Sequence, residues 1–538
     1  MHLFLTGPLL WLLAEAALLS PLLSPRRDVN AVCSTLHSKY PGHLAWDPVS
    51  LHGLQTLRGT LEYNAALLDY WNVKSASNRP VCAFFPADAE QVSFAVRTLN
   101  AHPSVRFALK SGGHNPNLGF SSVDDGVLIA FRPNSRYAVP APDGRTIDVG
   151  AGAKWEDVYS ALQPLGKAAV GGRLGDVGVI GLTLGGGLSY LSAQYGFACD
   201  NVVSFQCVLA DGAIVEASRT SHSDLYFALR GGGNQYAIVT SMTLKAYDVG
   251  DQGMVWGGIR TYTADKVRAL LAAVSNFTTN GQDPKAAIIP NFAFISAAGL
   301  NLPAALVFYF YDGREPPAGL FDEFDAIPHL TSSTAIRSFV SITNQVLGGD
   351  MKGLRFQIRE NTFPNMPMPT MSSFLHDHFQ KVLESTTDEA LTDLVDLRLL
   401  TFAVQPIPRG IAQASLEMGG GNALGLAPEH GDRVWVEYDI AWASPLCDEK
   451  CPDFLRQTAD SVLNLHKRNY AGISPTNYIE GDIDFLSYNP IFMNDAMSDQ
   501  KVLKSYGDEV YQRLKVIHKK YDPEGFFSTR QGGFHFSQ

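Results

Sequence analysis

Two glycine-rich stretches and one histidine carry the clearest chemical signal in the sequence. The first stretch, KSGGHNPN at residues 110–117, follows an apolar run that we predict to be a strand. Adjacent glycines let the backbone approach a ligand closely and turn successive N–H groups toward phosphate oxygens. A Gly-Gly-His sequence by itself is more typical of an ordinary turn, in which the histidine only makes local hydrogen bonds.

The second stretch, GGRLGDVGVIGLTLGGG at residues 171–187, holds eight glycines, although the whole chain has only 48 in 538 residues. A turn needs one or two glycines, so this stretch predicts backbone wrapped around an extended cofactor. It is not a Rossmann fingerprint, because no Gly-x-Gly-x-x-Gly opens a helix directly after a strand with an acidic residue about twenty positions later. It is not a P-loop, because no Gly-Lys-Ser/Thr occurs in it. A third cluster, RGGGNQYAIVT at 230–240, joins a predicted helix to a predicted strand.

The elements that must position these loops alternate between strands and helices from residue 81 to about 248. A strand at 81–86, a helix at 88–99 capped by Asp88, and a strand at 105–110 make a unit of βαβ size. Further predicted elements are strands at 126–131 and 146–153, a helix at 154–166, a hairpin at 202–217 that turns at Asp211-Gly212, a helix capped by Ser223, and a strand at 237–249.

The pattern changes between about residues 250 and 481. Apolar runs at 254–263, 286–296, 304–313 and 433–442 are separated by helix-like segments and by proline-rich loops. This pattern predicts an antiparallel sheet with helices on one face. A helical pattern at 506–520 stops at Pro523, and we expect Phe526 and Phe527 to anchor the tail to a core.

The run at 433–442 brings carboxylates to one side of a strand. Alternation places Val434, Val436, Tyr438, Ile440 and Trp442 on one face, which should pack on helices, and Trp435, Glu437 and Asp439 on the other. The second face either lines a substrate pocket, where carboxylates can have raised pKa values, or is a solvated outer face.

Composition excludes several classes of protein. The net charge is −11, from 42 Lys and Arg against 53 Asp and Glu, and without basic blocks such a chain is a poor nucleic-acid binder. Hydrophobic residues make up 46%, enough for a sizeable core, and no repeat is present. The two cysteines of CDEKC at 447–451 have no histidine or second cysteine pair to complete a metal site, so we expect no metal.

The first twenty residues predict a signal peptide, with an apolar stretch at 3–13 followed by Ala14-Glu15-Ala16. The alternative is a buried amphipathic helix. Cleavage would leave a secreted chain with no membrane span, in which disulfides are possible. Cys33–Cys82 is then the favoured pair, Cys447–Cys451 is open, and Cys199 and Cys207 are expected to be buried thiols. Asn276 would be a glycosylation site.

Taken in order, these motifs resemble the FAD-linked oxidoreductases of the berberine-bridge-enzyme-like family, which have the vanillyl-alcohol-oxidase type of fold. The matching stretches are RPVCAFFPADAEQVSFAVR, KSGGHNPN, GDVGVIGLTLGGGLSYLSAQYGFACDNVVSFQCVLADG, LRGGGNQYAIVT, FMNDAMSDQKVLKSYG and YDPEGFFSTRQGGF. The resemblance implies an α+β fold with an FAD-binding domain of two α+β subdomains and a substrate domain whose antiparallel sheet is covered by helices. The expected boundaries are 1–20 for the signal peptide, 21–250 and 485–538 for the FAD-binding domain, and 251–484 for the substrate domain.

The resemblance also implies roles for single residues. The family attaches the 8α-methyl of FAD to the histidine of Gly-Gly-His, which is His114 here. The other residues expected to hold the cofactor are Ser111, Gly112, Gly113, Asn115, Gly178, Gly181, Gly185, Gly186, Gly187, Ile238 and Val239. Some relatives add a cysteine link in Cys-Pro-Thr-Val-Gly, but Leu174 stands at the cysteine position, so one link is expected.

The motif that implies the catalytic base differs in this chain. Relatives often carry Tyr-x-Asn-Tyr near the C-terminus, where this chain has Phe492-Met493-Asn494-Asp495 and neither tyrosine. The base candidates are therefore Asp495 and Glu437, with Tyr488 and Tyr438 behind them.

The leading hypothesis is an FAD-dependent oxidoreductase that oxidises a small organic molecule, a secondary metabolite or a sugar, with oxygen as acceptor. A carboxylate would take a substrate proton while a hydride passes to flavin N5. The alternatives are a flavin-dependent isomerase or cyclase without net redox, and a secreted flavin-binding protein without catalysis. A monomer is expected.

Overall fold

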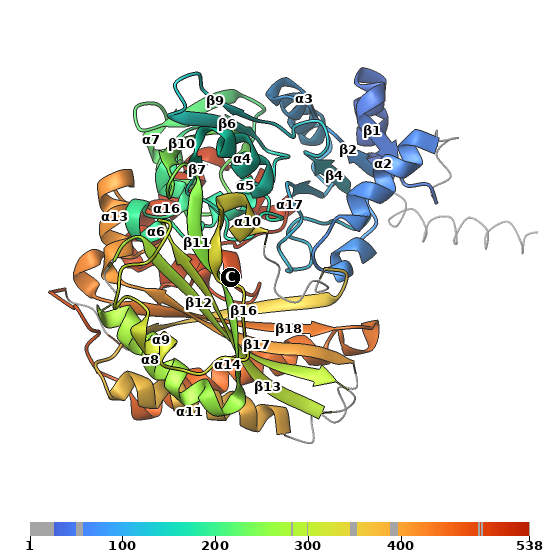
Figure 1. Ribbon diagram of the computed structural model, residues 1–538. Helices are drawn as coiled ribbons and strands as arrows, with labels where there is room; N and C mark the ends of the chain where they lie inside the picture. The colour runs from blue at the N-terminus through green and yellow to red at the C-terminus, as the bar shows by residue number, and fades with distance from the viewer. Residues whose placement is uncertain are drawn as a thin grey trace, which may run out of the picture.

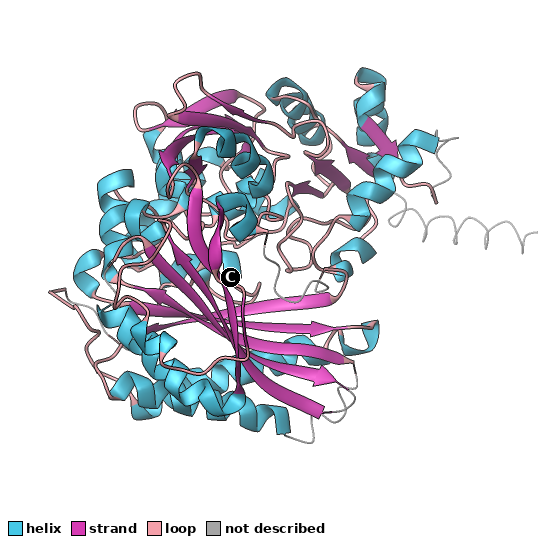
Figure 2. Ribbon diagram, viewed as in Figure 1, coloured by secondary structure: helices cyan, strands magenta, loops and turns pink. Residues whose placement is uncertain are grey.

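The structure, a computed structural model, describes residues 26–49, 57–280, 283–297, 300–344, 352–387, 396–481, 485 and 488–536. The predicted signal peptide lies outside these residues. The described strands form three sheets. In Figures 1 and 2 the two smaller sheets lie above the third and larger one.

The first sheet contains the predicted βαβ unit with one strand inserted. Its order is β1 (Leu44–Trp46), β2 (Cys82–Phe84), β4 (Val127–Ala130), β3 (Phe107–Lys110), with helices α2 (Leu57–Leu68) and α3 (Ala89–Asn100). Both β2 and β3 pair with β4 in parallel, so β4 separates the two strands that α3 connects. Asp88 caps α3, as predicted, because its side chain accepts a hydrogen bond from the Gln91 amide.

The second sheet is built around the long strand β10 (Ile238–Asp248). Its order is β5 (Ala138–Pro140), β6 (Thr146–Gly150), β10, β8 (Val202–Val208), β9 (Ile214–Ser218), and β7 (Lys167–Ala169) also pairs with β10. Its helices are α4 (Trp155–Leu162), α5 (Val179–Leu184), α6 (Ser192–Tyr195) and α7 (Ser223–Ala228). The predicted 202–217 hairpin is confirmed as β8–β9. Ser223 is not the cap of α7, because the helix begins at Ser223 and His222 takes the cap position.

The third sheet is antiparallel throughout, as predicted. Its order is β14 (Thr331–Ser332), β11 (Met254–Thr263), β13 (Leu300–Tyr311), β12 (Ala286–Ala297), β17 (Leu397–Ile407), β18 (Arg433–Trp442), β16 (Arg355–Pro364), and β15 (Ala335–Ser338) pairs with β11. The sequence did not predict β16 or β17. In β16 the polar run Arg359–Asn361 interrupts the apolar pattern that identifies a strand.

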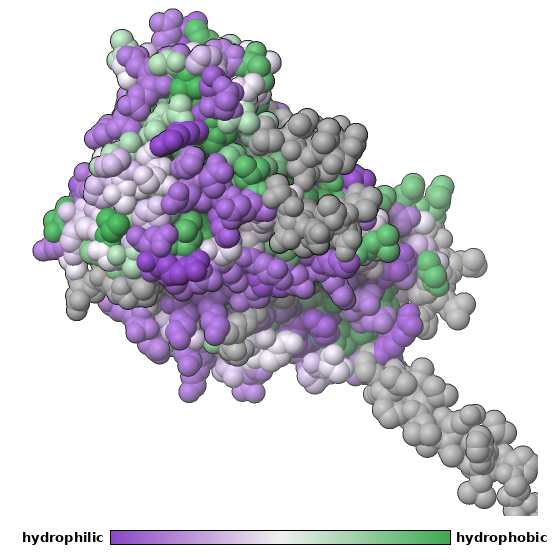
Figure 3. Space-filling model, turned by 90° about the horizontal axis from the view of Figure 1, so that it is seen from below, coloured by the Kyte–Doolittle hydropathy of each residue, from purple (hydrophilic) through white to green (hydrophobic). Residues whose placement is uncertain are grey.

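Helices cover one face of this sheet, below it in Figure 1. They include α8 (Val267–Asn280), α11 (Thr370–Thr387) and α14 (Lys450–Asn469), while α9 (Asp322–Asp325), α10 (Phe339–Thr343) and α13 (Arg409–Gly419) lie in the connections. The predicted inner face of β18, from Val434 to Trp442, is buried in one core with these helices. Their outer surface, seen from below in Figure 3, is mainly hydrophilic, as expected of amphipathic helices. Among the described helices, none combines the length and apolarity needed to cross a bilayer.

The C-terminal segment returns to the first two sheets through α15 (Val502–Ser505), α16 (Asp508–Tyr521) and α17 (Phe526–Arg530). Phe526 packs on Phe107 of β3 with ring centroids 5.1 Å apart. Arg530 donates hydrogen bonds to the carbonyl oxygens of Leu99 and Val105. The predicted anchoring of the tail by Phe526 and Phe527 is therefore confirmed.

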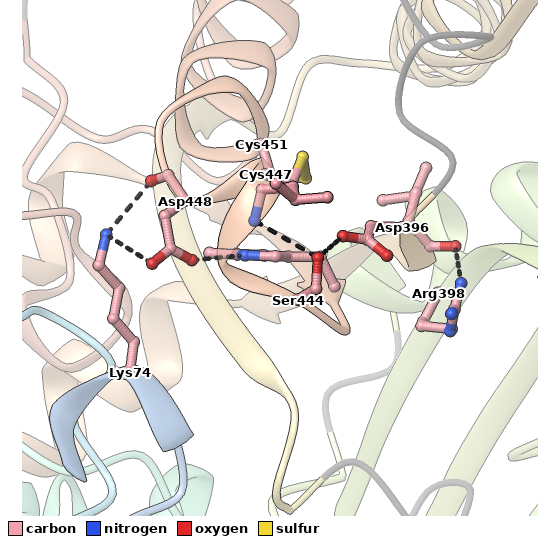
Figure 4. Close-up of a disulfide and its surroundings, with 10 residues drawn as sticks. Lys74, Asp396, Arg398, Ser444, Cys447, Asp448 and Cys451 are labelled. Carbon is pink, nitrogen blue, oxygen red and sulfur yellow. Dashed lines mark hydrogen bonds and ion pairs between the residues drawn. A yellow bond between two sulfur atoms is a disulfide. The ribbon is translucent and has the colours of Figure 1, made fainter. Parts of the chain in front are cut away.

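Both candidate cysteine pairs form disulfides. Cys33, on the helix that includes residues 26–39, is bonded to Cys82 of β2, and Cys447 to Cys451 at the start of α14. Figure 4 shows the second disulfide beside Asp448, which accepts a hydrogen bond from Trp442 Nε1 and pairs with Lys74 Nζ at 3.8 Å. Lys74 lies in the short helix η2 (Val73–Ser77), so this contact ties the third sheet to the first part of the chain.

Candidate functional site

A cavity of about 330 Å³ lies where the three sheets meet. Leu109 of β3, Val239 of β10 and Glu437 of β18 all line it. Its other walls come from the loop at 111–116, the glycine stretch at 173–188, residues 233–237, residues 492–495 and residues 533–534. The cavity therefore gathers the three glycine clusters and the C-terminal motif that the sequence singled out.

The two main glycine stretches touch each other backbone to backbone beside this cavity. A Cβ atom on Gly112 would stand 2.6 Å from Gly178 Cα, closer than real Cβ contacts come. Gly113 has φ +70°, and a Cβ there would stand 2.7 Å from the carbonyl oxygen of Asp69. Only glycine fits at these positions, so the backbone itself forms the wall next to His114.

His114 lines the cavity with an imidazole that makes no hydrogen bond through Nε2. This atom is buried and has no partner among the described residues. Burial, opposed by the nearby Asp176 carboxylate, lowers the pKa of His114 to about 4. The ring is therefore neutral at pH 7, the state in which an imidazole nitrogen is a nucleophile.

Four residues of alternating charge form a cluster of ion pairs near His114. Lys154 Nζ lies 3.5 Å from Asp69 Oδ1 and 3.4 Å from Asp176 Oδ1. Lys352 Nζ lies 2.9 Å and 3.5 Å from the same two carboxylates. The pKa values of both aspartates are lowered although burial opposes it, because the two lysines favour the ionised carboxylates.

Most of the residues expected to hold the cofactor line the cavity. These are Ser111, Gly112, Gly113, His114, Asn115, Gly178, Gly181, Gly185 and Val239. Gly186, Gly187 and Ile238 lie behind this wall: a Cβ on Gly186 would meet Leu424, one on Gly187 would meet Leu182, and Ile238 is fully buried in β10. Leu174, which the resemblance aligns with the cysteine of a second link, also lines the cavity.

Asn494 joins the C-terminal motif to the glycine stretch. Its Oδ1 accepts a hydrogen bond from the Gly187 amide at 3.1 Å, and its Nδ2 donates to the carbonyl oxygen of Leu182 at 3.2 Å. Asn494 is not among the site residues predicted from the sequence. It lies in the short helix η8 (Met493–Asp495), which also carries Asp495 into the cavity wall.

Two candidate base residues, Glu437 and Asp495, both line the cavity and are both half-buried. Burial raises the pKa of Glu437, while Arg173 and a hydrogen bond with Asp439 act in the opposite direction. Burial and the charge of Glu437 raise the pKa of Asp495 well above its ordinary value, again opposed by Arg173. Neighbouring carboxyls whose pKa values differ in this way can hold one proton between them.

Sequence reasoning missed two further groups, Arg173 in the cavity wall and Glu360 on the strand beside Glu437. Arg173 lines the cavity and donates a hydrogen bond from Nη1 to Gln405 Oε1 of β17. As the cation inside the glycine stretch, it could have been noticed. Glu360 of β16 lies opposite Glu437 in the strand register, is fully buried, and burial raises its pKa well above normal. No motif identified Glu360, because β16 itself was not predicted.

The two tyrosine candidates lie elsewhere. Tyr438 is on the helix-covered face of β18, where its hydroxyl lies 3.1 Å from His378 Nε2. Tyr488 donates its hydroxyl hydrogen bond to the carbonyl oxygen of Gly425, and Arg433 lies over its ring. Neither tyrosine lines the cavity.

The residues present fit an FAD better than a metal. The glycine walls expose backbone to the cavity, and both Ser111 Oγ and His114 Nε2 are buried without partners among the described residues. Within the described part of the chain, no group of three or more His, Cys, Asp or Glu residues is arranged to hold a metal ion.

Comparison with known proteins agrees with this donor set. Residues 80–218 match the family model described as an FAD binding domain. An uncharacterized FAD-linked oxidoreductase of Arthroderma benhamiae is 33% identical over 89% of this chain and 91% of its own length. Among solved structures, 6-hydroxy-D-nicotine oxidase from Arthrobacter nicotinovorans has a TM-score of 0.68 at 20% identity, covering 90% of this chain and 98% of its own.

A second solved structure is of an enzyme whose FAD is described as bonded to a histidine. Glucooligosaccharide oxidase from Acremonium strictum, described with a 6-S-cysteinyl, 8α-N1-histidyl FAD, has a TM-score of 0.68 at 18% identity. The match covers 94% of this chain and 99% of the oxidase chain. At this identity the likeness concerns the fold.

Proposed function

Because the chain belongs to the FAD-linked oxidoreductases of the berberine-bridge-enzyme-like family, we propose that it oxidises a small organic molecule with an FAD bonded to His114. One observation carries the proposal: a single cavity is lined by His114, by the two touching glycine stretches and by the carboxyl groups of Glu437 and Asp495. A cofactor cradle and candidate acid–base groups thus share one space.

The cofactor would be held by backbone more than by side chains. Ser111, Gly112 and Gly113 would cradle the pyrophosphate with their amides, and Gly178 and Gly181 would lie along the ring system. His114 would supply the covalent link, since its neutral imidazole faces the cavity. A leucine at position 174 cannot form a second bond, so we propose one link.

Bound FAD would accept a hydride at N5 and pass the electrons to molecular oxygen. Glu437 would accept the proton that leaves the substrate O–H, N–H or acidic C–H group. Its raised pKa brings its basicity closer to neutral pH, and Arg173 keeps it ionised. Asp495, whose pKa is raised much further, would stay protonated and act as a hydrogen-bond donor to the substrate or to Glu437.

The substrate side of the cavity combines apolar and polar groups. Ile358, Phe492 and Met493 contribute apolar surface. Arg173 and Glu437 contribute charge, and the protonated Asp495 contributes a hydrogen-bond donor. This mixture suits an oxygen-bearing organic molecule, and we propose a secondary metabolite or a sugar as the substrate class.

The test is anaerobic reduction of the purified flavoprotein by candidate substrates. The proposed function requires loss of the flavin absorbance with a substrate, its recovery in air, and consumption of oxygen in step with product. Turnover without oxygen consumption would instead support the isomerase or cyclase. A flavin that no phenol, alcohol, amine or sugar reduces would support the binding protein.

We also propose an oxidising compartment, because two disulfides form in the described residues. The possible glycosylation site Asn276 is half-buried in α8, and its Nδ2 donates a 2.6 Å hydrogen bond to Glu323. A glycan on Asn276 would have to replace this hydrogen bond. Mass spectrometry of the secreted protein would therefore decide whether the site is used.

A further inference from the structure

The indole ring of Trp71 lies flat against the imidazole ring of His114. The ring centroids are 4.5 Å apart and the ring planes meet at 24°. The same indole also meets the ring of Phe356 in β16 edge to face, with centroids 6.2 Å apart. Trp71 therefore contacts both the His114 loop and the third sheet.

Hydrogen bonds on both sides of His114 hold this stack together. The Trp71 amide donates to the carbonyl oxygen of Gly113 at 3.0 Å, immediately before His114. Asn72, which is 1% exposed, donates from Nδ2 to the carbonyl oxygen of Pro116 at 2.8 Å, two residues after it. The Oδ1 atom of Asn72 accepts a hydrogen bond from the Phe356 amide at 3.2 Å. Residues 71–72 and the His114 loop are thus one hydrogen-bonded unit fastened to β16.

Among the described residues, the His114 ring has no hydrogen bond at Nε2 to fix its rotation. Rotation of a histidine ring about its Cβ–Cγ bond is otherwise soft. An offset stack with a large aromatic ring limits that rotation. The stack with Trp71 therefore restricts the plane of the His114 ring.

The plane matters because the lone pair of an imidazole nitrogen lies in it. In the attachment step, a His114 nitrogen bonds to the 8α carbon, replacing one C–H bond of the methyl group and the N–H bond of the imidazole. Both hydrogens leave as protons, and the two electrons pass into the isoalloxazine ring, which acts as the oxidant of the step. Small errors in the direction of attack slow such reactions strongly.

We propose that Trp71 is a positioning residue for the covalent attachment of FAD: its indole holds the His114 imidazole in the plane from which a ring nitrogen reaches the 8α carbon. The inference rests on the proposed function, since it requires His114 to carry the flavin. Trp71 would contribute little to the affinity for FAD itself, because it does not line the cavity.

The test compares attached and merely bound flavin in four full-length variants. Trp71→Leu removes the ring, Trp71→Phe keeps a smaller ring, and His114→Ala removes the nucleophile. Trp256→Leu is the matched control, because Trp256 is a half-buried tryptophan of β11 that stacks on Phe321 at 5.7 Å, in the helix-side core of the third sheet. Each protein is incubated with excess FAD, and samples are precipitated with acid over time. Total bound flavin is measured before precipitation and attached flavin in the pellet.

The expected results separate positioning from structural damage. Trp71→Leu should still bind FAD but attach it about tenfold more slowly than the wild type, and Trp71→Phe should restore most of the rate. Trp256→Leu should attach FAD at the wild-type rate. If Trp71→Leu does not fold, Trp71→Phe decides the question, because it should attach FAD measurably more slowly than the wild type.

Two kinds of failure remain distinguishable. A wild-type pellet without flavin would overturn the covalent link of the proposed function, and this inference with it. Attachment at the wild-type rate in a folded Trp71→Leu protein, or in Trp71→Phe where Trp71→Leu does not fold, would overturn the role of Trp71 alone.

Discussion

Gly112 and Gly178 meet backbone to backbone, so that a Cβ atom on Gly112 would stand 2.6 Å from Gly178 Cα. They come from stretches more than sixty residues apart, one after β3 and one before α5. Their contact closes the wall of the cavity beside His114. The glycines are therefore required by a tertiary contact as well as by the proposed approach of a cofactor.

Replacing Gly178 by alanine should damage both stability and cofactor binding. The added methyl group would overlap the Gly112 backbone, and such overpacking costs about 1–3 kcal/mol. We expect Gly178→Ala to lower the free energy of unfolding by that amount and to lose most of its FAD. Gly410→Ala is the control, because Gly410 lies in α13 with nothing within 4 Å of the added Cβ. Equal FAD content in the two variants would contradict the assignment.

Glu437→Gln should remove the proton acceptor. We expect flavin reduction by substrate to slow about 100-fold or more, the usual contribution of a general base. In the wild type the rate should rise with pH through the pKa of Glu437, which burial raises above the ordinary 4.5. Stopped-flow reduction without oxygen, measured across pH, tests both statements. A Glu437→Gln protein with wild-type reduction would exclude Glu437 as the base.

Asp495→Asn should act differently from Glu437→Gln. In the proposed mechanism Asp495 is protonated, and so uncharged, over the pH range in which Glu437 ionises. An uncharged amide in its place should therefore leave the rising limb of the pH profile where it is in the wild type, while the maximal rate falls less than in Glu437→Gln. A loss of rate as large as that of Glu437→Gln, together with a displaced limb, would instead make Asp495 the base.

The buried His378 should make the protein less stable in acid. It is fully buried beside Phe402 and Tyr438, and burial lowers its pKa from 6.5 to about 3. The unfolded chain takes up this proton near pH 6.5 and the folded chain does not. The contribution of His378 is thus complete above pH 6.5 and is lost as the pH falls toward 3.

For one such group the loss is about 1.4 kcal/mol per pH unit. Urea unfolding at pH 6 and pH 5 measures how far the free energy of unfolding falls between the two pH values. This fall should be smaller in His378→Gln than in the wild type by about 1.4 kcal/mol. His37→Gln, which alters an exposed histidine, is the control and should leave the dependence unchanged. Identical pH dependence in wild type and His378→Gln would refute the assignment.

The two disulfides should differ in their effect on stability. Cys33–Cys82 spans 49 residues and Cys447–Cys451 spans 4. The entropy of loop closure predicts a loss of about 4 kcal/mol for the double serine variant of the first and about 2 kcal/mol for that of the second. Urea unfolding of both variants measures the difference. Equal losses would show that loop entropy does not govern these bonds.

Sequence patterns predicted the local elements well and their spatial order only in part. The βαβ unit, the hairpin at Asp211-Gly212 and the two faces of β18 each follow from patterns within one segment. The insertion of β4 between β2 and β3 does not, because strand order depends on packing between segments. The strand β16 was missed because Arg359 and Glu360 are buried with partners from elsewhere in the chain, Asp499 and the Phe492 amide.

In the site, too, the sequence predicts features that lie within one segment and misses those that depend on contacts between segments. The glycine stretches and His114 are visible in the sequence because backbone contact with a cofactor demands glycine at several neighbouring positions. Trp71, Arg173 and Asn494 each act as single side chains whose partners are distant in sequence. No spacing rule links such residues, so only the three-dimensional structure brings them together.

The most direct measurement is mass spectrometry of the peptide that contains residue 114, after proteolysis of the purified protein. The account predicts that this peptide is heavier by one FAD less two hydrogens, that no other peptide carries flavin, and that the modification is absent from His114→Ala. An unmodified residue 114 in a protein that has bound FAD, or flavin attached to another residue, would contradict the account.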